Sequence, residues 1–351
     1  VGVMSQMRTA ASIMAIVTGL LISVISLRFE HRKLLLIGLG MYTVSSFLCS
    51  IAPDYLSMIL FYSINGMAGA FAGPMTTTLV AAYFPPKKRS SVIGLMAASQ
   101  ASTFVFGTPL IYFVSSWGGW RSTFGILLLA FSLVTLATSM IALKPKPLNP
   151  QMKTQGGYSK SFKNILANKS ALACLIVSSL ASAAWVALLV FLPSFRRQRN
   201  LLSTDFVTIL TMVSASCYII GSLGSGKIVN KLGRKKIAEI AALILGIFTI
   251  AYTNVPDLWL SVACTCIAAL FGGLRFSATT SLTLEQVPEF RSTMMSLYSV
   301  TDSIGSAIGA GVGGFILVSY NYEGMAAALG AMGILSSIIL WKYAVDPLKK
   351  Q

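Results

Sequence analysis

Two ionisable residues, Arg275 and Asp302, lie deep inside long apolar stretches of the sequence. Arg275 precedes Glu285 by ten residues, and Asp302 follows Arg291 by eleven. If both stretches are helices, these two side chains lie about 15 Å from the same end, at 1.5 Å per residue. A charge in an apolar medium is unfavourable unless it is paired or hydrated. We therefore expect a charge pair that either exchanges an ion or polar ligand or serves as a static structural bridge.

Polar side chains also recur at helical spacing in three apolar stretches. The rows are Tyr62 and Asn65 in 56–83, Ser178, Ser182 and Trp185 in 171–192, and Thr265, Gly272 and Thr279 in 258–284, with Arg275 beside the last row. Small and hydroxyl residues let helices pack closely, so packing is one interpretation of these rows. Matched rows in more than one stretch favour a polar cavity instead.

The residue inventory offers little support for catalysis or metal binding. The single histidine, His31, lies in a basic stretch, where a solvated surface role is the simpler interpretation. The five cysteines lie in apolar stretches without metal-ligand spacing. Residues 221–227 match the first seven positions of a phosphate-binding P-loop, but Ile228 replaces the required Ser or Thr. We expect no catalytic residue, no metal ion and no cofactor.

The composition is that of a membrane protein. Of 351 residues, 55% are hydrophobic and 11% are charged, whereas a soluble domain has about 25% charged residues. The net charge of +17 could suggest a nucleic-acid partner, but most Lys and Arg residues lie in short connections between apolar stretches. That distribution is typical of loops that set membrane topology. The low fraction of charged residues excludes solubility in water. The distribution of Lys and Arg argues against nucleic-acid binding.

Eleven apolar stretches are predicted to cross the lipid bilayer, whose apolar core is about 30 Å thick. Backbone groups in lipid must be paired within each segment, and strands of barrel length are absent from the pattern, so the stretches are predicted to be helices. The predicted spans are residues 9–27, 34–52, 56–83, 92–117, 124–143, 171–192, 206–225, 240–253, 258–284, 294–320 and 325–344.

The positive charges predict the orientation of the spans. Lys and Arg concentrate in alternate connections, including 144–170 and the C-terminal residues. Basic loops stay on the cytoplasmic side of a membrane. We therefore expect a multi-pass protein of the cell (plasma) membrane, with a cytoplasmic C-terminus and a cytoplasmic 144–170 linker. The cluster of Arg196, Arg197 and Arg199 departs locally from this rule.

The two halves of the chain align with each other. At an offset of 203 residues, Pro53 matches Pro256 and Gly69 matches Gly272. The sixth stretch has no partner, so we expect a further helix before Val1 and an all-α architecture of two six-helix bundles, with 11 of 12 helices present. The predicted domains are a bundle over 1–143 that lacks its first helix, a basic linker over 144–170, and a bundle over 171–351.

Two six-helix repeats joined by a basic linker resemble the major facilitator superfamily. Members carry a pattern close to Gly-x-Leu-x-Asp-Arg-x-Gly-Arg-Arg in the loop after the second helix of each half. The second-half copy here contains Gly226, Asn230, Gly233 and Arg234, and the first-half copy is degraded to Arg28 and Arg32. The resemblance implies that these loops gate the cytoplasmic side. Leu27 and Asn230 replace the acid, which predicts weaker closure.

The resemblance also implies a secondary active transporter that works by alternating access and performs no covalent chemistry. In the family, three of the helices that line the cavity correspond here to 56–83, 171–192 and 258–284. The residues accordingly expected to bind a small-molecule substrate are Tyr62, Asn65, Ser178, Ser182, Trp185, Thr265 and Arg275. Asp302, with Gln100 aligned to it at an offset of 202 residues, is expected to couple transport to an ion such as H+ or Na+.

The residues leave the substrate and the direction of transport open. A buried arginine favours a small organic anion, whereas Tyr62 and Trp185 would also suit an amphipathic compound. A drug or metabolite efflux proton antiporter is one alternative, although Tyr62 and Asn65-Gly66 replace the Arg and Gln-Gly that such antiporters usually carry. A non-transporting membrane receptor or scaffold is a second alternative. We expect a monomer.

Overall fold

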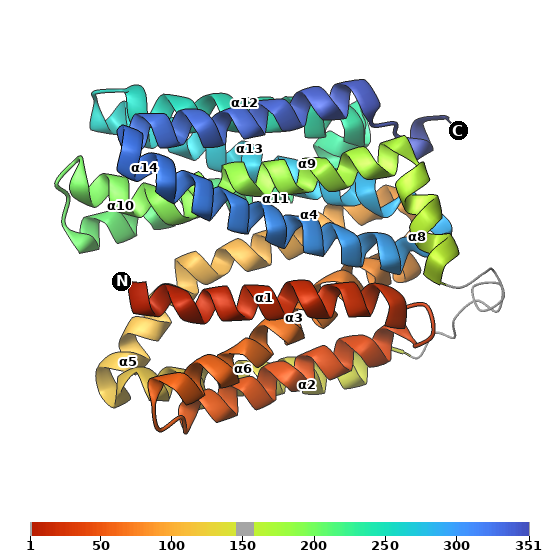
Figure 1. The fold of residues 1–351 in the computed structure, drawn as a ribbon, viewed down its shortest axis with the longest axis horizontal. Helices are drawn as coiled ribbons and strands as arrows, with labels where there is room; N and C mark the ends of the chain where they lie inside the picture. The colour runs from red at the N-terminus through yellow and green to blue at the C-terminus, as the bar shows by residue number, and fades with distance from the viewer. Residues whose placement is uncertain (1, 145–157, 351) are drawn as a thin grey trace. The chain divides into compact units, whose positions relative to one another are not determined.

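The computed structural model describes residues 2–144 and 158–350, and every regular element in these ranges is helical (Figure 1). The elements of the first half are α1 (Gly2–Ile25), α2 (His31–Ser50), α3 (Tyr55–Tyr83), α4 (Pro86–Ser102), the π-helix η1 (Thr103–Gly107), α5 (Thr108–Ser122), the π-helix η2 (Thr123–Leu128) and α6 (Leu129–Ala142). The later elements are α8 (Tyr158–Ala167), α9 (Lys169–Val186), the π-helix η3 (Ala187–Phe191), α10 (Leu192–Gln198), α11 (Thr204–Leu232), α12 (Arg234–Asn254), α13 (Leu258–Leu284), the 3-10 helix η4 (Pro288–Phe290), α14 (Arg291–Tyr343) and the 3-10 helix η5 (Pro347–Lys350). The predicted all-α fold is confirmed.

The helices have the lengths that a bilayer requires. Eight helices in the described ranges are long and apolar enough to span a membrane, and two of them, Pro86–Ala142 and Pro288–Tyr343, contain 57 and 56 residues. A straight helix of that length would measure about 85 Å, more than twice the thickness of the apolar core. Each run is interrupted, at Gly119 with φ 71° and at Asn321 with φ 63°. Both interruptions fall between predicted spans, so the eight helices contain ten spans. The shorter apolar helix Ala10–Ile25 brings the described part of the chain to the eleven predicted.

Backbone contacts group the chain into two compact units. Unit 1 comprises Val1–Tyr83, Gly107–Ile165 and Val287–Val300, and unit 2 comprises Phe84–Phe106, Leu166–Gln286 and Thr301–Gln351. Unit 2 therefore takes α4 from the first half of the chain, and unit 1 takes the beginning of α14 from the second. The predicted domain boundaries, which follow the sequence repeat, stay a prediction, and residues 145–157 of the predicted linker lie outside the described residues.

In unit 1, α3 packs against α1 and α2, and α2 also packs against α6. The approach of α1 to α3 requires glycine at position 66, because a Cβ atom there would overlap the backbone of Ala11. The buried apolar core of this region consists of Ile22, Leu34, Leu35, Met75 and Leu79. This core fixes α3, which carries Tyr62 and Asn65.

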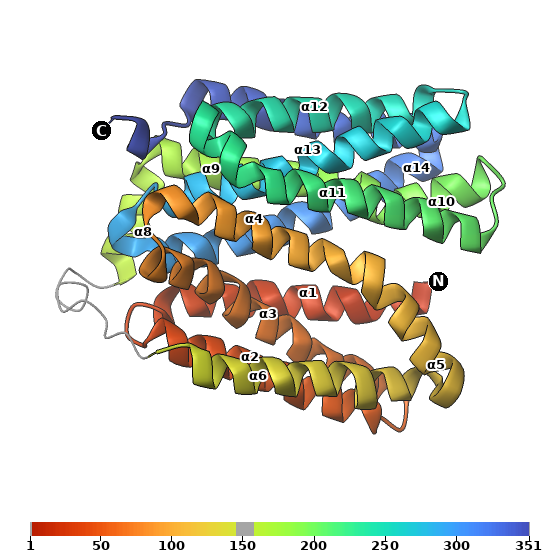
Figure 2. The ribbon, with the colours of Figure 1, turned by 180° about the vertical axis from the view of Figure 1, so that it is seen from behind.

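In unit 2, α13 packs against α4, α9, α11 and α12. Figure 2 shows α4 running alongside α11, with which it is also in contact. The helix α14 crosses α9 closely, because Gly305 and Gly309 lie against the backbone of Ser179 and Ala183. The central position of α13 brings its polar residues Thr265 and Arg275 into the interior of the unit, where they are 0% and 4% exposed.

Candidate functional site

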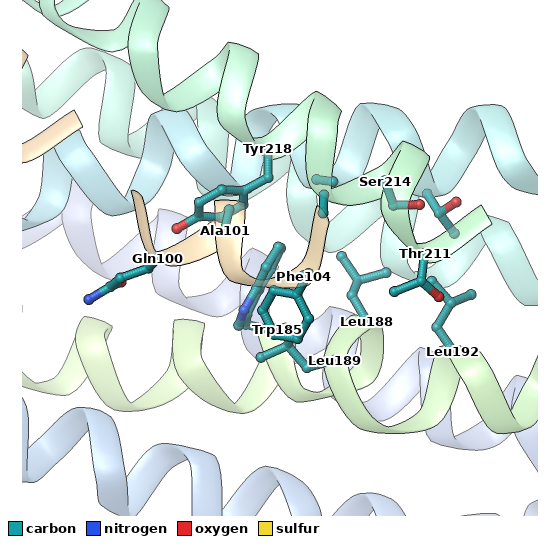
Figure 3. Close-up of a pocket in the computed structure, with 13 residues that line it drawn as sticks. Gln100, Ala101, Phe104, Trp185, Leu188, Leu189, Leu192, Thr211, Ser214 and Tyr218 are labelled. Atoms are coloured by element: carbon teal, nitrogen blue, oxygen red, sulfur yellow. The ribbon is translucent and has the colours of Figure 1, made fainter. Parts of the chain in front are cut away.

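A cavity of about 210 Å³ lies within unit 2 (Figure 3). Its wall is formed by α4 and η1, by the continuous run of α9, η3 and α10, and by α11 and α13. The lining residues are Gln100, Ala101, Phe104, Trp185, Leu188, Leu189, Leu192, Thr211, Ser214, Ala215, Tyr218, Thr265 and Ala269. Aromatic and aliphatic groups with a few hydroxyl and amide groups are typical of sites for small organic molecules.

Trp185 and Tyr218 form an aromatic part of the wall. Their ring centroids are 5.0 Å apart, and the ring planes are inclined at 46°. The indole of Trp185 also lies against α13 at Gly272, where a Cβ atom would come within 2.5 Å of the ring. Glycine at position 272 therefore leaves room for the indole beside the backbone of α13.

The residues of the predicted polar row on α9 do not all face the same neighbour: two contact α14 and one lines the pocket. Ser178 shares a hydrogen bond of 2.7 Å with Thr301, and Ser182 donates a hydrogen bond to Asp302, so both serines contact α14. Trp185, further along the same helix, lines the pocket instead. Of the residues predicted to bind substrate, the pocket brings together Trp185 and Thr265, and it adds Gln100, which was predicted for coupling.

The predicted ion pair of Arg275 with Asp302 is not formed among the residues that the structure describes. Asp302 accepts a hydrogen bond from Ser182 Oγ. Arg275 is 4% exposed, and its Nε has no hydrogen-bond partner in the described ranges. The charge of Arg275 still acts on Asp302, because electrostatic interactions in a low-dielectric interior extend beyond contact distance. The two residues are therefore coupled electrostatically, although they form no ion pair in the part of the chain that the structure describes.

Tyr62 and Asn65 lie on α3, in unit 1. The ring of Tyr62 packs edge-on against Phe124, with centroids 6.5 Å apart and planes at 89°. Neither residue lines the pocket of unit 2. Their role in substrate binding stays a prediction.

The loop motif between α11 and α12 holds the N-terminus of α4. Gly233 ends α11 with φ 90°, a conformation that favours glycine. The side-chain amide of Asn230 donates to the Lys87 carbonyl at 2.8 Å, and Arg234 donates to the Pro86 carbonyl at 2.9 Å. A carboxylate at position 230 could only accept hydrogen bonds. Asn230 is thus suited to the contact that the structure shows, although the family pattern has an acid there.

The first-half copy of the motif makes a different contact. Arg32 donates to the Met140 carbonyl at 2.8 Å, within unit 1. Arg28 is exposed. Arg32 therefore links the start of α2 to the end of α6, and the gating role of both arginines stays a prediction.

A buried ion pair between Arg89 and Glu285 joins α4 to the end of α13. The side chains are 9% and 3% exposed. Arg89 Nε also donates to the Phe84 carbonyl at 3.0 Å. Sequence reasoning missed this pair because 196 residues separate its members. The available signal was an acid directly after an apolar span.

One family model matches almost the whole chain. The model described as Major Facilitator Superfamily matches residues 1–215 and 202–351. Among curated proteins, an uncharacterized MFS-type transporter of Bacillus subtilis (strain 168), YceJ, is 24% identical over 341 residues, which is 93% of this chain and 83% of that protein.

Solved structures of the same fold are more distant in sequence. The human organic anion transporter MFSD10 (TETRAN) has a TM-score of 0.80 at 14% identity, over 95% of this chain and 83% of that one. The proton:xylose symporter XylE, bound to 6-bromo-6-deoxy-D-glucose, has a TM-score of 0.80 at 14% identity, over 98% and 86% of the two chains. At these identities the likeness establishes the fold alone, and it agrees with the predicted architecture.

Proposed function

Because this chain belongs to the major facilitator superfamily of membrane transporters, we propose that it moves an amphipathic organic compound across the bilayer by alternating access. The observation that carries this proposal is the pocket of unit 2. The rings of Phe104, Trp185 and Tyr218 offer a large apolar contact area. The hydroxyl groups of Thr211, Ser214 and Thr265 already donate to backbone carbonyls of their own helices. The wall therefore suits an apolar body better than a strongly hydrated solute such as a sugar.

In alternating access, a site near the middle of the membrane opens to one side at a time. The helix α4 suits such a cycle. Gln100 near its far end and Phe104 in the following η1 border the pocket, while its N-terminus is held by the α11–α12 loop. Release of the hydrogen bonds from Asn230 and Arg234 would free that end of α4. Movement at the loop is thereby linked to the shape of the pocket.

Asp302 is our candidate for ion coupling. Its carboxylate is held by Ser182, on the same helix as Trp185. Uptake of a proton or sodium ion at Asp302 would change the charge balance with Arg275 and the contact with α9. The same helix would then transmit this change to the pocket.

Counterflow of radiolabelled probes into liposomes that contain the purified protein tests the proposal. Indole-3-acetate, indole-3-acetamide and tryptamine share an indole body and differ in charge, and D-xylose represents a hydrophilic solute. We expect counterflow of at least one indole probe and none of D-xylose. A pH gradient then separates an efflux proton antiporter from a symporter by the direction of probe accumulation.

Two outcomes would contradict the proposal. Counterflow of D-xylose alone would exclude an amphipathic substrate class. Binding of the indole probes without counterflow of any of them would instead favour a receptor or scaffold.

A further inference from the structure

Four arginines are buried in the described part of the chain, all in unit 2: Arg89, Arg196, Arg234 and Arg275. Three of them have an acid close enough to balance their charge. Arg89 pairs with Glu285, Glu285 and Asp346 act on Arg234, and Asp302 interacts with Arg275. Arg196 is the exception within the described residues.

Arg196 lies in the last turn of α10 and is 1% exposed. Its Nη2 donates to Thr265 Oγ1 at 2.9 Å, and its Nη1 has no hydrogen-bond partner among residues 2–144 and 158–350. The ionisable groups that act on it are those of Cys266 and Tyr252, which are ordinarily neutral near pH 7. The guanidinium is therefore a buried positive charge without a counter-ion in the described chain. Such a charge is strongly unfavourable unless something else balances it.

This charge lies directly behind one end of the pocket. Thr265, which accepts the hydrogen bond from Arg196, lines the cavity, and so does Leu192, one turn earlier on α10. Residues four positions apart share a helix face, so Arg196 lies one turn beyond Leu192 on the same side of α10, behind the wall at Thr265. None of the lining residues that the structure describes is charged. The field of the guanidinium therefore enters the cavity with little screening.

We propose that Arg196 makes the end of the pocket at Leu192 and Thr265 selective for an anionic group, so that the transported compound is an amphipathic carboxylate. Its apolar body would lie against Trp185 and Tyr218, and its carboxylate would supply the counter-ion that the chain lacks. This inference rests on the proposed function, since it orients the substrate in the same pocket. Arg196 acts through its field, because the Thr265 hydroxyl that accepts from it already donates to the Val262 carbonyl at 2.8 Å. It takes over the anion recognition that was expected of Arg275.

Binding of the three indole probes to the full chain in phosphatidylcholine nanodiscs tests this inference. We expect the wild type to bind indole-3-acetate about tenfold more tightly than indole-3-acetamide, as a charged interaction of about 1.4 kcal/mol gives, and tryptamine most weakly. In Arg196→Gln the ratio of acetate to amide affinity should fall to about one, and Arg196→Lys should keep part of it. The exposed neighbour Arg197 provides the matched control, and Arg197→Gln should keep the wild-type ratio.

The outcomes separate this inference from the proposed function. Equal binding of acetate and amide by the wild type would overturn the inference alone, without any variant having to fold. An equal loss of all three probes in Arg196→Gln would assign Arg196 a structural role and overturn it as well. If no indole probe bound the wild type, the proposed function itself would fail. Finally, loss of the acetate preference on adding phosphatidylglycerol would show that a lipid phosphate occupies the site, which would also overturn the inference.

Discussion

Replacement of Glu285 by glutamine is expected to lower the free energy of unfolding by about 3–5 kcal/mol, because it removes the carboxylate from a buried ion pair. The partner Arg89 would keep its charge in a site where its side chain is 9% exposed. The contact between α4 and the end of α13 should loosen. Thermal unfolding of the purified protein, followed by circular dichroism, measures the effect.

Two further variants make this result interpretable. Glu323→Gln breaks the pair of Glu323 with Arg199, in which the side chains of Arg199 and Glu323 are 59% and 33% exposed. Pairs of that kind contribute about 0–1 kcal/mol. The double variant Arg89→Met with Glu285→Met removes both charges and should recover most of the lost stability. If Glu285→Gln were no less stable than Glu323→Gln, the buried pair would not anchor α4.

Replacement of Trp185 by alanine should weaken binding of the transported indole probe by at least about tenfold, because large aromatic side chains dominate contact energies in such sites. The indole forms the pocket wall together with Tyr218, at a centroid distance of 5.0 Å. Trp185→Phe keeps an aromatic ring and should retain part of the affinity. Equilibrium binding to the protein in nanodiscs measures the change.

The matched control is Trp259→Ala. Trp259 is 65% exposed at the start of α13, and its ring packs edge-on against Phe206, with centroids 6.4 Å apart. It does not line the pocket. Affinity should therefore be unchanged in this variant, and an equal loss in both variants would mean that Trp185 acts through general stability.

The fold could be predicted because its signals are local in the sequence. Each span needs about 20 apolar residues, and one continuous stretch of sequence shows whether they are present. The break at Gly119 was local in the same way, because it falls between the predicted spans 92–117 and 124–143, and the structure gives this glycine a φ of 71°. The assignment of α4 to unit 2 could not be predicted in this way, because it depends on the helices, distant in the sequence, that α4 contacts.

The site could be predicted only in part, because spacing along one helix does not identify the neighbouring helix. Ser178, Ser182 and Trp185 share a face of α9, but the serines meet α14 and the tryptophan meets α11 and α13. Counting residues likewise predicted that Arg275 and Asp302 lie at the same depth. The count does not tell toward which neighbouring helix each side chain points. Phe104 and Tyr218 were missed because aromatic residues are ordinary in apolar spans.

The arginine cluster at the end of α10 shows why a charge count alone misleads. Arg196 is buried against Thr265, Arg197 is exposed, and Arg199 pairs with Glu323 at 2.9 Å. These three residues therefore have different surroundings, although the sequence presents them as one departure from the topology rule. Burial of Arg196 depends on α13, which lies far away along the chain.

Photolabelling of the full chain with 5-azidoindole-3-acetate, followed by peptide mass spectrometry, tests most directly whether the pocket of unit 2 holds the substrate. The label carries the indole body that the aromatic wall should contact. We expect adducts on peptides that contain Phe104, Trp185 or Tyr218, and their suppression by excess indole-3-acetate. Adducts confined to α3 around Tyr62 and Asn65, and suppressed by the same competitor, would place the site in unit 1 and contradict the assignment.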